Sequence, residues 1–388
     1  MHVTLRTLHD DDLDAYLELR EHSFGYPPGD DVRTELRGRM PFTVGAFDPT
    51  GRLVASAARP SFETFVGGRR QPLLGVAAVQ TTLPARRRGV ARTLMARLLA
   101  DGREDGIGWS LLYPFDPRFY DRLGWQSLPT GVRLAMDMAW LEPPRPVDTW
   151  PVGSDLRSAL QEVYQRCAAG WNFSNARTVG PWDVWSDMLP ERGGRGAAYR
   201  VEDGYAVLRL RDAGAAGTIL DVIDAAWCSP SGRDEVLSLL AAYGGQADRL
   251  EIELPHDEAL AWSLADWFTV PTRATRMVRV VDLTAALAPL VPNDDTLACT
   301  VRVRDALAPW NDGTWRITPG PEGCAVEPTS AAVAATLDVR AVPLLVGGAA
   351  TPEAVLRAGL ADGDRRALAT LAALSTGRTP YQSLNDRF

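Results

Sequence analysis

Apolar residues recur at strand-like and helix-like spacing through the first part of the chain. Residues 3–8 alternate apolar and polar side chains and predict a first strand. Residues 13–24 place apolar side chains at helical spacing directly after three aspartates, which suit the start of a helix. Alternation and turn residues then predict two antiparallel pairs of strands, residues 43–47 with 53–57 and residues 62–66 with 71–79.

Residues 73–99 combine a strand, a basic turn and a helix. The apolar run that begins at Leu73 ends before Pro84, and Val90, Leu94 and Leu98 are spaced as on one face of a helix. The turn between them holds three consecutive arginines, residues 86–88, followed by a glycine. Unpaired amides at a helix start and arginine side chains both favour a phosphate group. The pattern therefore predicts a pyrophosphate site; the alternative is a solvated basic helix start.

A second informative segment covers residues 109–125. Residues 109–113 predict a buried strand, and Asp116 with Pro117 suits the N-cap and first position of a short helix. Gly124 suits the residue after the end of that helix. Phe119, Tyr120 and Leu123 share one side of it, so the pattern alone makes Tyr120 a core residue.

The rest of the chain shows two further patterns. A proline-rich segment, residues 142–151, predicts a domain boundary. Beyond it, three strands, a helix and a strand repeat the order of the first domain without its arginine-rich turn, and residues 276–281 are expected to end this second domain as a strand. From residue 283 a strand-rich half and several helices predict an α+β domain. The predicted fold class is mixed α/β, with domains at residues 1–142, 143–284 and 285–388.

Composition limits the class of protein. The chain has 388 residues, 46% of them hydrophobic and 23% charged, as in globular domains. Its net charge of -8 argues against nucleic acid as a partner, and all 41 basic residues are arginines. The four cysteines and four histidines are scattered, so we expect neither a metal site nor disulfides. Without a long apolar run or a secretory leader, the chain is expected to be cytoplasmic and not bound to a membrane.

Two of these segments together resemble a known family. Arg86-Arg-Arg-Gly89-Val-Ala91 resembles the Arg/Gln-x-x-Gly-x-Gly/Ala element of the GNAT acetyltransferases, and Phe119-Tyr-Asp-Arg-Leu-Gly-Trp125 resembles their Phe-Tyr-x-x-x-Gly-aromatic element. With the C-terminal segment from Leu344 to Phe388, the domain order resembles the Eis (enhanced intracellular survival) family. That resemblance implies two GNAT-like domains, the second of them degenerate and without CoA, followed by a sterol-carrier-like domain.

The resemblance also implies a chemistry and its residues. The co-substrate would be acetyl-CoA, the general acid Tyr120, and the general base the terminal carboxylate of Phe388. A homo-oligomer, in relatives a hexamer, is implied in the same way. The CoA-binding residues would be Val76, Ala77, Ala78, Val79, Gln80 and Thr81 for the pantetheine arm, and Arg86, Arg87, Arg88, Gly89, Val90 and Ala91 for the pyrophosphate.

The acceptor site is less defined by the sequence. Phe24, Tyr26 and Asp30 are candidates to line it, and a plain surface turn is the alternative. His22 and Asp30 are the substitute bases if the terminal carboxylate is not used. The expected acceptor is a primary amine on a small molecule or a lysine-bearing peptide or protein. Two other functions stay open: a non-catalytic CoA- or lipid-binding module, and transfer of a longer acyl chain.

Overall fold

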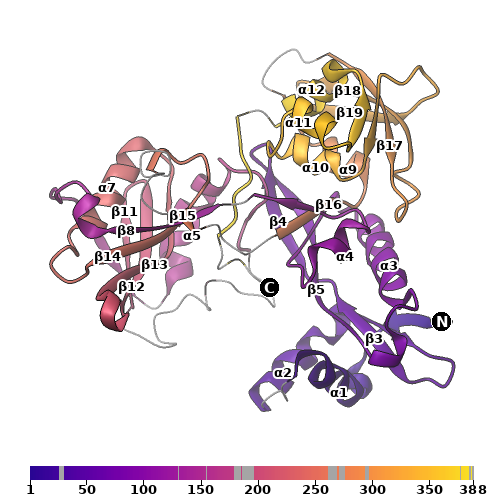
Figure 1. The fold of residues 1–388 in the computed structure, drawn as a ribbon, viewed down its shortest axis with the longest axis horizontal. Helices are drawn as coiled ribbons and strands as arrows, with labels where there is room; N and C mark the ends of the chain where they lie inside the picture. The colour runs from indigo at the N-terminus through magenta and orange to yellow at the C-terminus, as the bar shows by residue number, and fades with distance from the viewer. Residues whose placement is uncertain are drawn as a thin grey trace.

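The computed structural model describes residues 1–25, 30–129, 131–153, 155–178, 185, 196–260, 269–270, 276–292, 297–375, 377–383 and 386. Figure 1 shows three lobes, formed in turn by the N-terminal, middle and C-terminal parts of the chain. Among these described residues, no helix is both long and apolar enough to cross a lipid bilayer.

A mixed sheet forms the centre of the first lobe. The hairpin and the second strand pair expected from alternation are confirmed by the antiparallel pairing of β2 with β3 and of β4 with β5. The strands run in the order β1 (Thr4–Thr7), β2 (Thr43–Phe47), β3 (Leu53–Ala58), β5 (Arg69–Thr81), β6 (Trp109–Leu112), β16 (Arg276–Val280) and β7 (Gln126–Leu128), while β4 (Ser61–Val66) joins β5 to β10 (Ser174–Asn175). The helices are α1 (Leu13–Phe24), α2 (Asp30–Arg39), α3 (Val90–Glu104) and α4 (Pro117–Asp121).

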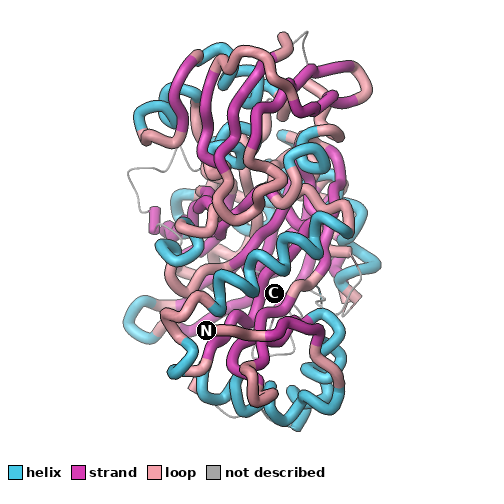
Figure 2. The backbone as a smooth tube through the Cα atoms, turned by 90° about the vertical axis from the view of Figure 1, so that its right-hand side faces the viewer, coloured by secondary structure: helices cyan, strands magenta, loops and turns pink. Residues whose placement is uncertain are grey.

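Helix α3 covers one face of this sheet. Val90, Leu94 and Leu98, the residues that predicted the helix, are buried with Met95 and Leu99 in one apolar cluster that includes side chains of β2, β3 and β5. Figure 2 shows this long helix crossing the strands beneath it. Burial of the apolar stripe holds the start of α3 at the end of β5, which fixes the position of the basic turn.

The second lobe contains a sheet of its own and, among the described residues, two helices. Its strands run in the order β15 (Thr269–Val270), β8 (Val132–Asp137), β14 (Arg249–Leu254), β13 (Thr218–Trp227), β12 (Gly204–Asp212), β11 (Gly196–Val201) and β9 (Trp150–Val152). Its helices are α5 (Leu156–Ala168) and α7 (Pro230–Ala241).

The two sheets exchange strands, which the sequence did not predict. Residues 276–280, expected to end the second domain, form β16, and β16 pairs antiparallel with β6 and β7 of the first sheet. Strand β8, which precedes the expected boundary at residue 142, pairs with β14 in the second sheet. The strand expected at residues 276–281 is confirmed as β16, but its partners could not be predicted, because apolar alternation identifies a strand and not the edge at which it pairs.

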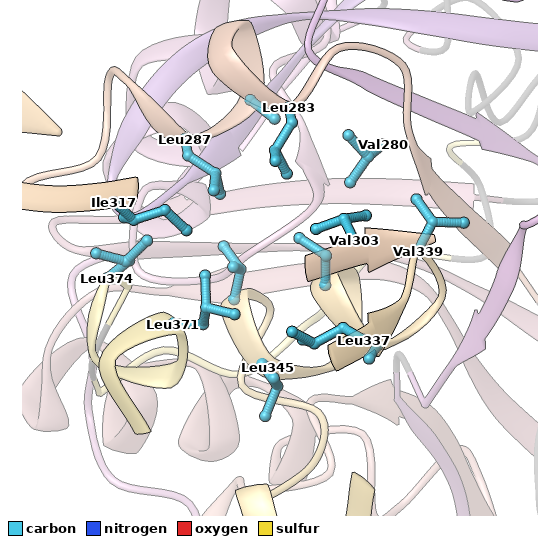
Figure 3. Packing of buried hydrophobic residues seen from close by; sticks show 14 of the residues in the cluster. Val280, Leu283, Leu287, Val303, Ile317, Leu337, Val339, Leu345, Leu371 and Leu374 are labelled. Atoms are coloured by element: carbon cyan, nitrogen blue, oxygen red, sulfur yellow. The ribbon is translucent and has the colours of Figure 1, made fainter. Parts of the chain in front are cut away.

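The C-terminal lobe is an α+β unit packed on the first. Its strands run in the order β19 (Gly323–Pro328), β18 (Gly313–Gly320), β17 (Cys299–Arg304), β20 (Ala335–Asp338) and β21 (Ala361–Gly363), with helices α9 (Leu283–Leu287), α10 (Ala341–Val346), α11 (Pro352–Arg357) and α12 (Arg365–Ala373). Figure 3 shows its core, in which Val303, Leu337 and Leu345 converge with Val280 of β16. One continuous apolar core therefore joins this lobe to the first sheet.

Candidate functional site

Strands β5 and β6 lie parallel and then separate. They pair from Leu73 opposite Trp109 to Val76 opposite Leu112, and β5 continues to Thr81. On the side facing β6, residues 77–81 pair with no strand among those described. Ala78 lies where the pairing of β5 with β3 shifts register, and its φ of 46° marks a bulge. The separation leaves a backbone edge that an extended ligand can pair with.

The turn after β5 leaves the start of α3 open. Arg87 and Gly89 have left-handed backbones, with φ of 58° and 83°, and Gly89 provides no side-chain cap for the helix. Arg86 N still donates to the Thr82 and Leu83 carbonyls; after it, the next described amide that donates to a backbone carbonyl is Thr93 N, which bonds to Gly89 O at 3.0 Å. A Cβ built on Gly89 meets no protein atom within 4 Å. Free amides, the helix dipole and open space fit a phosphate group.

A cavity of about 980 Å³ joins the strand edge to the helix start. Of the CoA-binding residues expected from the sequence, Val79, Gln80, Thr81, Arg86, Arg87, Gly89, Val90 and Ala91 line it, together with the acceptor candidate Phe24. Val76, Ala77, Ala78 and Arg88 are not among its lining residues. Arg92 and Arg122, which sequence reasoning missed, add positive charge, and the lining also includes Ser23, Ala85, Phe115, Asp116 and Phe119.

Helix α4 places Tyr120 behind the aromatic wall of this cavity. The helix forms as predicted, because the Asp116 side chain accepts a hydrogen bond from Arg118 N at 3.0 Å and Pro117 occupies its first position. Tyr120 is buried, with its ring 4.9 Å from that of Phe119 and 5.5 Å from that of Phe115. Burial raises the pKa of the Tyr120 phenol, so the hydroxyl stays protonated at neutral pH.

The C-terminal segment passes between the first two lobes. Asn172 N donates to Thr379 O at 2.9 Å, and Tyr381 N donates to Asn172 O at 3.0 Å. Further along, Tyr113, the residue that follows β6, donates its hydroxyl to the Asp386 carbonyl at 2.8 Å. The segment thus reaches the point at which β5 and β6 separate. Figure 1 shows its yellow trace running between the first two lobes.

Comparison with known proteins places each lobe in a family. Acetyltransferase (GNAT) domain models match residues 4–128 and 174–280, and a sterol carrier protein domain model matches residues 282–383. An N-acetyltransferase of Streptomyces coelicolor, itself uncharacterized, is 28% identical over 364 residues, covering 86% of this chain and 87% of that protein. The chain therefore carries two acetyltransferase (GNAT) domains followed by a sterol carrier protein domain.

Solved structures share this fold along the whole chain. Eis1 from Mycobacterium abscessus has a TM-score of 0.83 at 22% identity, covering 99% of this chain and 100% of that one. A GCN5-related N-acetyltransferase from Anabaena variabilis has a TM-score of 0.84 at 19% identity, covering 100% of both chains. At these identities the likeness concerns the fold.

The C-terminal lobe supports α4. The guanidinium of Arg279 on β16 is buried; it donates to the Leu123 carbonyl at the end of α4 and, at 2.6 Å, to both carboxylate oxygens of Asp305. Arg340 of the C-terminal lobe pairs with Asp121 at 2.7 Å. Sequence reasoning missed these residues because their partners lie far away along the chain.

The acceptor-side candidates are described only in part. Phe24 is exposed at the end of α1, and His22 Nδ1 donates to Glu18 O at 2.7 Å. The His22 side chain lines an adjoining cavity of about 400 Å³ that shares Ser23, Thr81 and Arg86 with the first. Asp30 begins α2, but its side chain is outside the description, as are residues Tyr26 and Phe388. The catalytic and binding roles of all these residues stay predictions.

Proposed function

We propose that the protein transfers the acetyl group of acetyl-CoA directly to a primary amine. The observation that carries this proposal is the cavity in which the unpaired edge of β5, the open start of α3 and the aromatic side of α4 meet. A ligand with an extended amide-bearing arm, a diphosphate and a thioester matches these three parts in order.

The protein contacts follow from that match. The pantetheine arm would pair with the backbone of residues 76–81, and the pyrophosphate would accept hydrogen bonds from the amides of residues 87–92. Arg86, Arg87, Arg92 and Arg122 would supply positive charge to the phosphates. Gly89 would let the diphosphate approach the backbone closely.

The proposed chemistry is one direct transfer. The amine nitrogen attacks the thioester carbonyl carbon, whose oxygen is stabilised by a backbone amide near the bulge at Ala78. A base removes the proton from the nitrogen, the carbon–sulfur bond breaks, and Tyr120 donates its phenolic proton to the departing sulfur. The phenolate then regains a proton from solvent. The raised pKa of Tyr120 keeps the acid loaded at neutral pH.

We assign the base to the terminal carboxylate of Phe388. The hydrogen bond from Tyr113 to the Asp386 carbonyl supports this, because Asp386 precedes Phe388 by two residues and Tyr113 stands next to the strand separation. A carboxylate near its ordinary pKa of about 3.5 is a weak base at neutral pH, so a partly buried position that raises that pKa would favour the role. His22 and Asp30 are the substitutes.

The acceptor is proposed as a small-molecule amine or an exposed lysine, and the assembly as a homo-oligomer by family resemblance. Release of free CoA should be measured with acetyl-CoA and a panel of amines, and repeated with longer acyl-CoA thioesters. Turnover of acetyl-CoA with an amine supports the proposal. Tight CoA binding without turnover of any amine would contradict it and favour a binding module; faster use of long acyl chains would contradict the acetyl assignment.

A further inference from the structure

The second lobe repeats the strand separation of the first. Strands β13 and β14 pair parallel from Ile219 opposite Arg249 to Asp221 opposite Glu251, and β13 then continues to Trp227 paired only with β12 on its other side. The pairing of β13 with β12 shifts register just after this point, as that of β5 with β3 does near Ala78. Asp224 therefore stands three residues beyond the last parallel pair, the same position that Val79 holds in the first lobe.

Val79 lines the proposed CoA cavity, but Asp224 faces the chain itself. Arg177 donates to both oxygens of Asp224, at 2.7 and 3.1 Å, and its Nε donates to Asp386 Oδ1 at 2.7 Å. Tyr205 donates its hydroxyl to Asp224 at 2.6 Å. Arg177, Asp224 and Asp386 are all buried, so the two carboxylates share one guanidinium away from water. Arg177 and its partner Asp386 thus lie on the side of Asp224 that corresponds to the cavity side of Val79.

Strand β14 also contacts this segment. The Tyr381 hydroxyl lies 3.5 Å from the Glu253 carbonyl of β14, and the Tyr381 ring packs edge-on against Trp171 at 4.8 Å. The Arg177 guanidinium stacks 3.8 Å from the Tyr164 ring centre. Both separated strands of the second lobe thus hold the C-terminal segment, one through a buried ion pair and the other through Tyr381.

Asp386 is held from both lobes at once. Its side chain binds Arg177 of the second lobe, while its carbonyl accepts from Tyr113 at the strand separation of the first. Only one residue separates Asp386 from Phe388, and an extended chain spans at most about 3.6 Å per residue. Fixing Asp386 therefore restricts where the terminal carboxylate can lie.

We propose that the second GNAT-like domain uses its counterpart of the CoA groove to hold the C-terminal segment, and that Arg177, acting through Asp386, is a positioning residue for the terminal carboxylate. This inference rests on the proposed role of Phe388 as the base. The second domain, which lacks a basic turn, would thus contribute to the reaction only by positioning the terminal carboxylate.

Substitution of Asp386 in the full-length protein tests this role. Asp386→Ala leaves Arg177 paired with Asp224, so the fold keeps its buried ion pair. We expect kcat to fall about 10- to 100-fold, the effect of misplacing a reacting group, with KM for acetyl-CoA changed less than about twofold. Asp386→Asn retains an oxygen for Arg177 Nε and should keep kcat within about threefold of wild type. A merely structural role would not produce this difference between kcat and KM.

A second measurement follows the position of the chain end directly. Carboxypeptidase should release the terminal residue at least about tenfold faster from Asp386→Ala than from wild type, because local release of the segment exposes it. Tyr113→Phe, which removes the hydrogen bond to the Asp386 carbonyl, should show the same effects more weakly and serves if Asp386→Ala does not fold. Glu353→Ala, which breaks an exposed ion pair with Arg365, is the control and should change neither kcat nor digestion.

A chain extended by two glycines beyond Phe388 separates this inference from the proposed function. We expect the extension to abolish most turnover because it removes the carboxylate from its position. Normal turnover by the extended chain would overturn the assignment of the base. Loss of turnover on extension, together with wild-type kcat and wild-type digestion in Asp386→Ala and Tyr113→Phe, would overturn the role of Arg177 and Asp386 alone.

Discussion

The two GNAT-like lobes differ most at the start of the helix that follows their separated strand. In the first lobe, Gly89 leaves the start of α3 without a side-chain cap and faces open space. In the second, the Ser229 hydroxyl accepts from Gly232 N at 3.0 Å and caps α7. A Cβ on Gly232 would lie 2.6 Å from the Asp203 carbonyl, so the chain itself closes this helix start.

This difference shows how one fold supports two tasks. Both lobes have a bulged strand that leaves its parallel neighbour and leads into a helix. The first keeps the amides and the strand edge open toward a cavity, whereas the second caps its helix start with Ser229 and places Arg177, which is paired with Asp386, against Asp224. Whether the backbone groups are already paired decides whether a ligand can bind there.

We expect the strongest loss of kcat on removing the Tyr120 hydroxyl of the first lobe, and no loss on removing a tyrosine hydroxyl of the second. Tyr120→Phe should lower kcat about 10²- to 10⁴-fold, the range for loss of a general acid, with little change in CoA affinity. Tyr243→Phe, which removes a hydroxyl contact with Tyr199 in the second lobe, is the matched control and should leave kcat unchanged. Steady-state kinetics decides this, and wild-type kcat in Tyr120→Phe would remove Tyr120 from the mechanism.

The next effect concerns stability of the second lobe. Arg177→Met leaves Asp224 and Asp386 buried without their shared cation and should lower the free energy of unfolding by about 3–5 kcal/mol. Arg133→Met, which removes a partly exposed guanidinium from Asp221 and Glu251, should cost about 1 kcal/mol or less. Urea denaturation of both variants measures the difference; equal losses would contradict a special role for the Arg177 cluster.

Local sequence signals predicted some elements of this site. Contacts between residues far apart in the sequence could not be predicted. Asp116, Pro117 and Gly124 fix α4 through caps and a left-handed residue, so the helix was readable from neighbouring residues. The partners of Arg177 lie 47 and 209 residues away, and no spacing rule connects them. The partners of β16 could not be predicted for the same reason, since alternation carries no information about sheet order.

A smaller effect is expected at the open helix start. Gly89→Ala forces an alanine into a left-handed backbone, at about 1–2 kcal/mol, and projects a methyl group toward the cavity. The dissociation constant of CoA should therefore rise about tenfold. Ser229→Ala in the second lobe should leave that constant unchanged and lower the free energy of unfolding by about 1 kcal/mol. An equal effect of both variants on CoA binding would contradict the division between the lobes.

The smallest effect concerns pH. Burial raises the pKa of Asp386, and the charge of Asp224 raises it further, whereas Arg177 and Arg276 lower it. The Tyr164 hydroxyl also faces the Asp386 carboxylate. Ionising Asp386 is therefore harder in the folded state, and this group reduces stability as the pH rises from about 4 through its folded pKa. The pKa of Asp224 is shifted in the opposite direction. Burial opposes its charge, but Arg177 lowers its pKa overall, so the stability that ionised Asp224 contributes is lost at acidic pH.

Asp386→Asn should accordingly unfold at a slightly higher temperature than wild type at pH 7, with the difference disappearing below about pH 4. Thermal unfolding across that pH range provides the measurement. A lower Tm for Asp386→Asn at pH 7 would mean that the ionised carboxylate stabilises the cluster, contrary to the direction of its pKa shift.

Calorimetric titration of the full-length protein with CoA tests the division of tasks most directly. We expect one CoA to bind per chain, with affinity weakened by Gly89→Ala and unaffected by Ser229→Ala. Two CoA molecules per chain, or no binding at all, would contradict it.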